Sequence, residues 1–212
     1  MVLITDIRPH KRTKLFEVYS EVGLEFLANE KFLNQNNILL RSEFNEDDFE
    51  LIRAKAQILT AIRKCVDMLS RKDYSQKELL RKLCEKGIPE DAALAAIKYM
   101  TDNGYQNDYR YAKRLAELGA NSYGRRRVEQ MLYTHGIDRE TIRQVTEEVF
   151  ENESAQADKL DEILEKVLRG KDINDPAQKN KAFAKMARLG YGSSEISAAF
   201  SRYIANRKDE TP

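Results

Sequence analysis

Residues 104–112 read Gly-Tyr-Gln-Asn-Asp-Tyr-Arg-Tyr-Ala and lie between two segments with helical periodicity. Gly104 favours the left-handed backbone conformation that ends a helix, and either Asn107 or Asp108 is suited to cap the helix that follows. A glycine that ends one helix, followed closely by a residue that caps the next, predicts a corner between two helices. Corners of this kind build arrays of stacked helices, provided that they repeat along the chain.

The aromatic residues of the same stretch suggest how the corner closes. Tyr105 follows the glycine and is expected to fold back onto the core, while Tyr111, Ala112, Leu115 and Leu118 belong to the next helix. Helical spacing places Tyr111, Leu115 and Leu118 on one side of that helix, which we expect to be buried. Tyr105 and Tyr111 are therefore predicted to be core residues.

The pattern of a helix that ends in glycine recurs along the chain. Glycine followed by Ile or Tyr ends a helical segment at Gly87, Gly136 and Gly190, at intervals of 49 and 54 residues. A second helical pattern follows each glycine, and another helix leads into each unit. The apolar positions of these second helices are Ala93, Ala96, Ile97 and Met100; Ile142, Val145 and Val149; and Ile196, Ala199, Phe200 and Tyr203. The natural division is three units of three helices.

Capping signals support this division of the chain into helices. Ser75 with Glu78 forms a capping box, and Asp175 before Pro176 places a cap ahead of a first-turn proline. Pro89 is likewise followed by two acids at the positive end of a helix dipole.

The first 44 residues do not share the helical periodicity of the rest of the chain. Three short β-branched or aromatic segments, Val2–Ile7, Leu15–Ser20 and Leu24–Ala28, predict a small antiparallel sheet. A brief helix from about Asn29 then connects this sheet to a long helix from Glu46 to about Lys72. The long helix is expected to bury one face made of Ile52, Ala56, Leu59, Ile62, Val66 and Leu69.

Composition favours thin helical layers. The 212 residues are 42% hydrophobic and 33% charged, with a mean hydropathy of −0.65, which suits an elongated, surface-rich molecule better than one thick core. No segment approaches the length of a membrane span, and no apolar signal segment follows Met1. Cytoplasm is the expected compartment.

Catalytic and metal chemistry are not favoured. Cys65 and Cys84 fall on different predicted helices, and His10 and His135 are the only histidines, so no metal site is predicted. Both cysteines are expected to be packing thiols, and His135 an ordinary helix-end residue. The sequence also lacks a glycine-rich phosphate loop, a nucleophile elbow and a paired-carboxylate motif, so we expect neither an enzyme nor a cofactor.

The net charge of +1 hides an uneven distribution. Residues 53–86 are rich in Lys and Arg, whereas residues 140–165 contain nine acids, read as a solvated helix face, against Arg143 and Lys159. The densest basic cluster is Arg125, Arg126 and Arg127, at a helix start whose dipole already attracts anions. One interpretation is a solvated helix start; the other is a contact surface for an acidic partner or phosphates. The candidate contact residues are Lys77, Arg81, Lys82, Arg110, Arg114, Tyr123, Arg125, Arg126 and Arg127.

Nearby tyrosines leave the type of partner open. Tyr109 and Tyr123 are candidates for contact, including base stacking. The sequence has no recognition-helix pattern for reading base edges, so sequence-specific DNA binding is not favoured.

Three motifs together resemble the RecX family of regulatory proteins. Residues 71–88, Arg-Lys-Asp-Tyr-Ser-Gln-Lys-Glu-Leu-Leu-Arg-Lys-Leu-Cys-Glu-Lys-Gly-Ile, look like the signature of its first repeat. Residues 104–112 look like its Gly-Tyr corner, and residues 124–137 like the second-repeat helix, with a glycine and basic residues followed by Leu and Gly-Ile. The resemblance covers roughly residues 60–140. The third repeat fits by period, and residues 1–44 fit those members that carry an N-terminal strand-forming extension.

The resemblance implies a mainly α fold, an elongated crescent of three tandem three-helix repeats, with repeats at 45–106, 107–153 and 154–208 after an N-terminal β-rich extension at 1–44. It also implies a monomeric protein that binds RecA or the RecA–DNA filament and modulates, most often inhibits, recombinase, ATPase and coprotease activity, with a basic surface in the filament groove. Two alternatives are a helical repeat protein that binds nucleic acid directly without sequence preference, and a helical scaffold for another protein. Salt dependence of binding distinguishes direct phosphate contact from a requirement for RecA.

Overall fold

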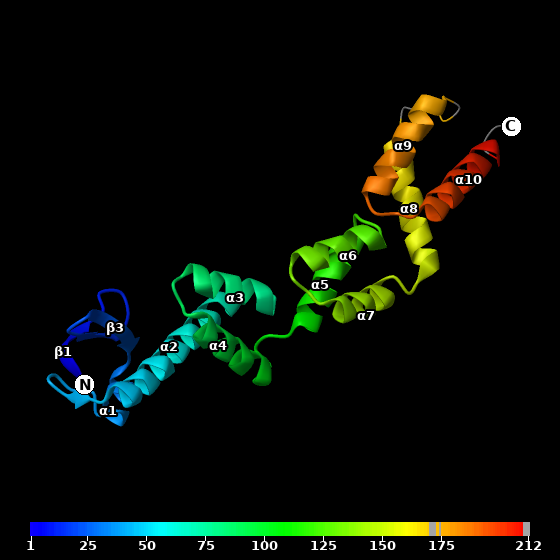
Figure 1. Ribbon diagram of the computed structural model, residues 1–212. Coiled ribbons are helices and arrows are strands. Elements are labelled where there is room, and N and C mark those ends of the chain that lie inside the picture. Colours follow the sequence, from blue (N-terminus) through cyan, green and yellow to red (C-terminus); the bar gives the residue numbers. More distant parts are fainter. Residues whose placement is uncertain (170–172, 174, 210–212) are drawn as a thin grey trace. The chain divides into compact units, whose positions relative to one another are not determined.

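The computed structural model describes residues 1–169, 173 and 175–209, and within them it contains ten helices and a four-stranded sheet (Figure 1). The chain folds as two compact units, Met1–Asn107 and Asp108–Pro212. The predicted fold class, mainly helical with a small N-terminal antiparallel sheet, is confirmed. The boundary between the two units falls inside the 104–112 stretch.

The N-terminal sheet has the strand order β3-β2-β1-β4, with antiparallel pairing throughout. The three predicted strands are present. A fourth, only two residues long, was too short to produce an alternation signal in the sequence. Ile4, Val18 and Phe26 are the buried centre of the sheet. The strands are β1 (Val2–Pro9), β2 (Phe16–Ser20), β3 (Gly23–Ala28) and β4 (Glu43–Phe44).

Helix α1 (Glu30–Gln35) and helix α2 (Glu46–Leu69) follow the predicted positions because asparagines cap both. The Asn29 side chain accepts a hydrogen bond from the Phe32 backbone N–H at 2.8 Å, and the Asn45 side chain accepts one from the Asp48 N–H at 2.8 Å. Three acids in the first turn of α2 also favour the helix start.

Helix α2 contributes to two separate cores. Its first half buries Phe49, Ile52 and Ala56 against the sheet and α1, and its second half buries a different side of the helix, made of Ala61, Cys65 and Met68. At about 100° per residue the two buried stripes lie roughly 150° apart around the helix. The prediction of a single buried face was therefore wrong for Leu59 and Val66, which are 49% and 53% exposed.

The remaining helices form three groups, and each group has its own apolar core. The second half of α2 packs with α3 (Gln76–Glu85) and α4 (Glu90–Asp102). The second group contains α5 (Asp108–Ala120), α6 (Arg125–Thr134) and α7 (Arg139–Val149). The third contains α8 (Glu153–Leu168), α9 (Pro176–Arg188) and α10 (Ser193–Asp209). The predicted apolar faces of the last helix in each group, α4, α7 and α10, pack in these cores.

The glycines end their helices in the predicted way. Gly87, Gly104, Gly136 and Gly190 have φ of +76°, +73°, +81° and +95°. After Gly87 the Ile88 N–H donates to the Leu83 carbonyl at 3.1 Å, the long-range bond of a Schellman motif, and the same bond follows the other three glycines. The capping box at Ser75 and the cap at Asp175 are also confirmed, and Pro89 is an N-cap without a side-chain hydrogen bond.

The corner closes differently from the prediction. Tyr105 is 62% exposed, and the buried residue is Gln106, at 2% exposed. The Gln106 side chain accepts from the Thr101 hydroxyl at 3.2 Å and donates to the Tyr74 carbonyl at 3.2 Å. Burial of this polar side chain is tolerated because both ends of its amide are hydrogen-bonded.

The buried side of α5 is lined by small residues. Ala112, Ala116 and Gly119 are buried, whereas Leu118 is 63% exposed and Tyr111 is only partly buried. Small side chains allow neighbouring helices to approach closely. The face predicted from the spacing of Tyr111, Leu115 and Leu118 was therefore wrong at Leu118, and the predicted burial of Tyr111 was overstated.

The two cysteines differ in their surroundings. Cys65 is fully buried, as predicted, and burial raises the pKa of its thiol to about 11. Cys84 is exposed, so its predicted packing role was wrong. It occupies the solvent side of α3, where Leu79 and Leu83 form the buried side.

Gly104→Val is expected to lower the free energy of unfolding by about 1 kcal/mol or more, because a β-branched residue is strained at positive φ. A Cβ at this position would have no atom within 4 Å, so any loss reports backbone strain alone. Gly104→Asn is the matched control, since Asn tolerates this conformation better. Urea unfolding followed by circular dichroism measures both, and equal stability of wild type and the valine variant would contradict the expectation.

Candidate partner-binding surfaces

The basic residues of unit 1 lie along α3. Lys77 and Arg81 are exposed on this helix, and Arg81 donates to Glu85 at 2.5 Å. The Lys82 ammonium lies 5.7 Å from the centre of the Tyr74 ring, and Lys72 approaches the same ring at 4.6 Å. The three predicted contact residues of α3 therefore share one helix, with a tyrosine ring at its start.

In unit 2 the three consecutive arginines point in three directions. Arg125 donates to Glu129 at 2.9 Å. Arg127 donates to Gln130 at 3.0 Å, and its guanidinium lies 6.0 Å from the Tyr123 ring. Successive helix residues are about 100° apart, so three neighbours in sequence cannot form one patch on a helix.

Arg126 lines an open groove between α6 and α7, which we call the α6–α7 groove. Its volume is about 420 Å³. The lining residues are Arg126, Glu129, Gln130, Tyr133, Arg139, Ile142 and Arg143.

Three arginines meet in the α6–α7 groove, and only Arg143 has an ion pair there. It contacts Glu140, and it donates to Glu147 at 3.3 Å. The hydrogen bond and the charge of Arg143 lower the pKa of the Glu140 carboxyl. Arg126 and Arg139 form no ion pair with any residue in the described part of the chain.

Tyr133 adds a 65% exposed aromatic side chain to the same groove. Tyr133, Arg139 and Arg143 were not predicted as contact residues from the sequence. Helical spacing could have found the two arginines, which are four residues apart on α7 and hence on one face. The structure thus supplies a groove with cations and an aromatic ring, suited to an anionic partner.

A second hollow lies on the other side of α6. It has a volume of about 250 Å³ and is lined by Tyr123, Arg127, Gln130, Met131, Thr134 and His135. His135 is the C-cap of α6, and its Nδ1 lies 3.0 Å from the Tyr111 hydroxyl. The predicted contact residue Tyr123 is 36% exposed at this hollow.

Helix α5 carries the remaining predicted residues. Arg110 and Arg114 are exposed on it. Tyr109, considered above for partner contact, is partly buried and donates to Glu148 at 2.5 Å, and Lys113 donates to the same carboxylate at 3.0 Å. Both contacts lower the pKa of the Glu148 carboxyl, and the hydrogen bond to Glu148 raises the pKa of Tyr109. Tyr109 therefore serves the packing of α5 on α7.

Several carboxylates of the acid-rich segment pair with cations, some of them distant in the sequence. Besides the pairs of Arg143 and Lys113, Asp161 on α8 accepts from Arg202 on α10 at 2.6 and 2.7 Å. Over the residues that the structure describes, no group of three or more His, Cys, Asp or Glu side chains could hold a metal ion. None of the described helices is long and apolar enough to cross a membrane.

Comparison with known families gives two matches. Residues 61–100 match the first three-helix domain of RecX, and residues 107–145 match its second three-helix domain. The first match spans the end of α2 with α3 and α4, and the second spans α5, α6 and most of α7.

Curated relatives agree with these matches. Over 145 residues the chain is 33% identical to the regulatory protein RecX of Stenotrophomonas maltophilia strain R551-3, covering 68% of this chain and 86% of the relative. It is also 33% identical to that of Xanthomonas axonopodis pv. citri strain 306 over 141 residues, 66% and 85% of the two chains.

Solved structures extend the likeness of the fold. A crystal structure of a regulatory protein RecX matches with a TM-score of 0.70 at 21% identity, over 95% of this chain and all of that one. RecX from Lactobacillus salivarius matches with a TM-score of 0.60 at 20% identity, over 69% of this chain and 96% of that one. The helical groups, the two domain matches and the curated relatives lead to one assignment: this chain belongs to the RecX family of regulatory proteins.

Proposed function

We propose that this regulatory protein binds RecA or the RecA–DNA filament and restrains its recombinase, ATPase and coprotease activities. The regulatory role comes with the family, and RecA is the target that the motif resemblance implies. It acts as a monomeric binding protein, without catalysis or a cofactor, and the proposed target places it in the cytoplasm.

The α6–α7 groove is the observation that carries this proposal. Arg126 and Arg139 have no ion-pair partner in the described residues, and they stand beside the exposed ring of Tyr133. Cations that leave their charge uncompensated within the chain are available to acidic side chains or phosphates of a partner.

The repeat arrangement supports binding to a polymeric partner. We propose that the repeats are residues 45–106, 107–153 and 154–208, with an accessory β-rich extension at 1–44. Basic residues occur on α3 of unit 1 and on α5 and α6 of unit 2. Several weak contacts on one chain raise the overall affinity for a filament that repeats its own surface.

The test is the DNA-dependent ATPase of the RecA from the same organism. We expect added protein to lower ATP hydrolysis by assembled filaments at ratios well below one protein per RecA, because one chain contacts more than one subunit. Arg126→Ala with Arg139→Ala should weaken this inhibition. Lys181→Ala with Lys185→Ala, which removes two exposed cations of α9, is the matched control.

Unchanged ATP hydrolysis at equimolar protein would refute RecA regulation. Direct binding to DNA is the second candidate, and it is favoured by the same uncompensated arginines. In that case affinity for single-stranded DNA alone should fall steeply with salt, with a slope that scales with the number of phosphates contacted. Binding that requires RecA and depends weakly on salt supports the first proposal.

A further inference from the structure

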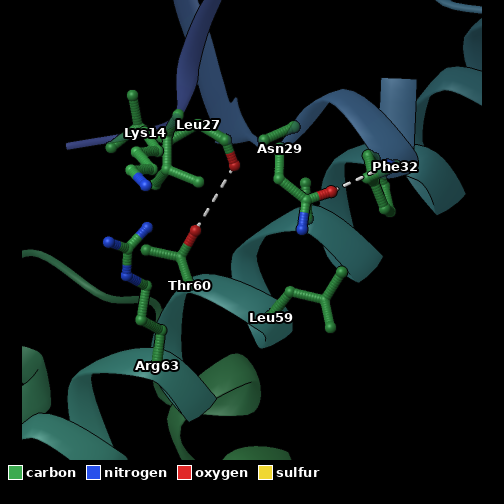
Figure 2. Close-up of a pocket in the computed structure, with 10 residues that line it drawn as sticks. Lys14, Leu27, Asn29, Phe32, Leu59, Thr60 and Arg63 are labelled. Carbon is green, nitrogen blue, oxygen red and sulfur yellow. Dashed lines mark hydrogen bonds between the residues drawn. The ribbon is translucent and has the colours of Figure 1, made fainter. Parts of the chain in front are cut away.

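A pocket in unit 1 lies between the N-terminal sheet and α2, outside the surfaces described above (Figure 2). Its volume is about 340 Å³. The lining residues are Lys14, Leu15, Leu27, Ala28, Asn29, Phe32, Ala56, Leu59, Thr60 and Arg63. The end of β3, the start of α1 and the middle of α2 all contribute.

Most of the lining is apolar, and it is held in place by hydrogen bonds. Ala28, Phe32 and Ala56 are buried core residues. The Thr60 hydroxyl donates to the Leu27 carbonyl at 3.4 Å, and Asn29 caps α1 through the Phe32 N–H, both drawn in Figure 2. These contacts within the chain join β3 to α2 and fix the start of α1, which sets the shape of the pocket.

Leu59 shows that this apolar surface is incompletely covered. The helical pattern of the sequence includes Leu59 among the apolar positions of α2, yet the residue is 49% exposed. Figure 2 shows it on α2 below Asn29 and Phe32. Covering an exposed leucine of this kind is favourable by about 25 cal/mol for each Å² removed from water.

Two cations complete the pocket, and no acid accompanies them. Lys14 and Arg63 are exposed, and the nitrogen-bearing ends of both lie on the same side of the pocket in Figure 2. Neither forms an ion pair with a described residue. Arg53, ten residues earlier on α2, contrasts with them because it is paired with both Glu25 and Glu50.

We propose that this pocket binds a short acidic segment of a partner protein, with an apolar side chain of that segment inside and its carboxylates on Lys14 and Arg63. The volume lies at the lower end of the roughly 300–1,000 Å³ of ligand pockets, which suits one or two side chains. The charge of the rim selects the carboxylates, and the apolar lining selects the residue beside them.

A nucleic acid fits this site less well. Base stacking needs an aromatic face in contact with solvent, and the aromatic residue of the lining, Phe32, is 7% exposed. The proposal is independent of RecA regulation, since the pocket shares no residue with the surfaces on α3, α5 and α6.

The experiment uses the full chain and a short fluorescent peptide, in which a Leu-Phe pair is flanked by Asp and Glu. Fluorescence anisotropy should show saturable binding. Replacing the Leu-Phe pair by Ser-Ser, or the acids by Asn and Gln, should each weaken it. Lys14→Gln with Arg63→Gln should weaken binding roughly tenfold, as expected for the loss of two partly exposed ion pairs.

The matched control is Lys31→Gln with Lys55→Gln, which removes the same charge from α1 and α2 outside the pocket. It should keep nearly full affinity, and circular dichroism of all variants checks folding. The proposal fails if the peptide does not bind the wild-type chain, or if both double variants bind equally well. It also fails if an oligothymidine binds and loses affinity on Lys14→Gln with Arg63→Gln while the peptide does not bind.

Discussion

Gly124→Ala is expected to destabilise unit 2 by about 2 kcal/mol or more, within the range for forcing extra atoms into a packed site. A Cβ on Gly124 would lie 2.6 Å from the Gly190 carbonyl oxygen and 2.8 Å from the Tyr191 nitrogen. These are backbone atoms, which cannot rotate away as a side chain can. The Gly124 N–H also donates to the Leu189 carbonyl at 2.9 Å. A backbone shift that makes room for the new Cβ would therefore also break this hydrogen bond.

The control for this prediction lies two residues from the contact. A Cβ on Gly192 would approach only the Glu195 side chain, with the nearest oxygen at 2.9 Å, and that side chain is flexible. Gly192→Ala should therefore cost much less than Gly124→Ala. Urea unfolding and limited proteolysis of both variants measure the difference; equal losses would show that the contact of the two glycines does not hold the second and third helical groups together.

The contact between Gly124 and Gly190 matters for function because it fixes the start of α6, the helix that carries the three arginines. Gly190 has φ of +95°, and a Cβ there would lie 2.5 Å from the backbone nitrogen of Arg127. The turn between α9 and α10 thus packs directly on the start of α6, where the three arginines begin. The third helical group supports the surface of the second.

The parts of the fold that depend on neighbours in sequence could be predicted from the sequence. Glycine stops at Gly87 and Gly136, the capping box at Ser75 and the Asp175 cap each depend on a few adjacent residues. Local hydrogen bonding and backbone conformation decide these features. Their repetition then gave the grouping of helices.

Buried faces depended on tertiary contacts and were predicted less well. A single helical pattern cannot reveal that α2 serves two cores on opposite sides, which leaves Leu59 exposed. The Gln106 side chain is buried in place of Tyr105 because, besides nearby Thr101, it reaches the Tyr74 carbonyl 32 residues earlier in the chain. No local pattern contains that information.

The candidate contact surface also depends on tertiary contacts that the sequence does not reveal. The sequence indicated Arg125, Arg126 and Arg127 as one basic cluster, but helical geometry separates them. The α6–α7 groove instead combines Arg126 with Arg139 and Arg143, which lie on a different helix. Their proximity follows from the packing of α7 on α6, which only the structure describes.

Replacing Arg125, Arg126 and Arg127 together by Ala is expected to leave unit 2 folded and to weaken binding to the RecA filament by roughly 1 to 3 kcal/mol. Stability should change little, because positive side chains oppose the helix dipole at this end and the ion pair of Arg125 with Glu129 is exposed. Alanine keeps the Cβ of Arg127, so the packing against Gly190 survives. Filament affinity and circular dichroism on the same preparation test both expectations.

A second triple variant, Lys181→Ala, Lys185→Ala and Arg188→Ala, removes the same charge from exposed positions of α9 and should bind the filament nearly as well as wild type. The single variants then locate the contact, since each arginine points to a different side of α6. A loss confined to Arg126→Ala would assign it to the α6–α7 groove, and a loss confined to Arg127→Ala to the hollow beside Tyr123. Full affinity in a folded triple arginine variant would remove α6 from the contact surface and make α3, with Lys77, Arg81 and Lys82, the next surface to test.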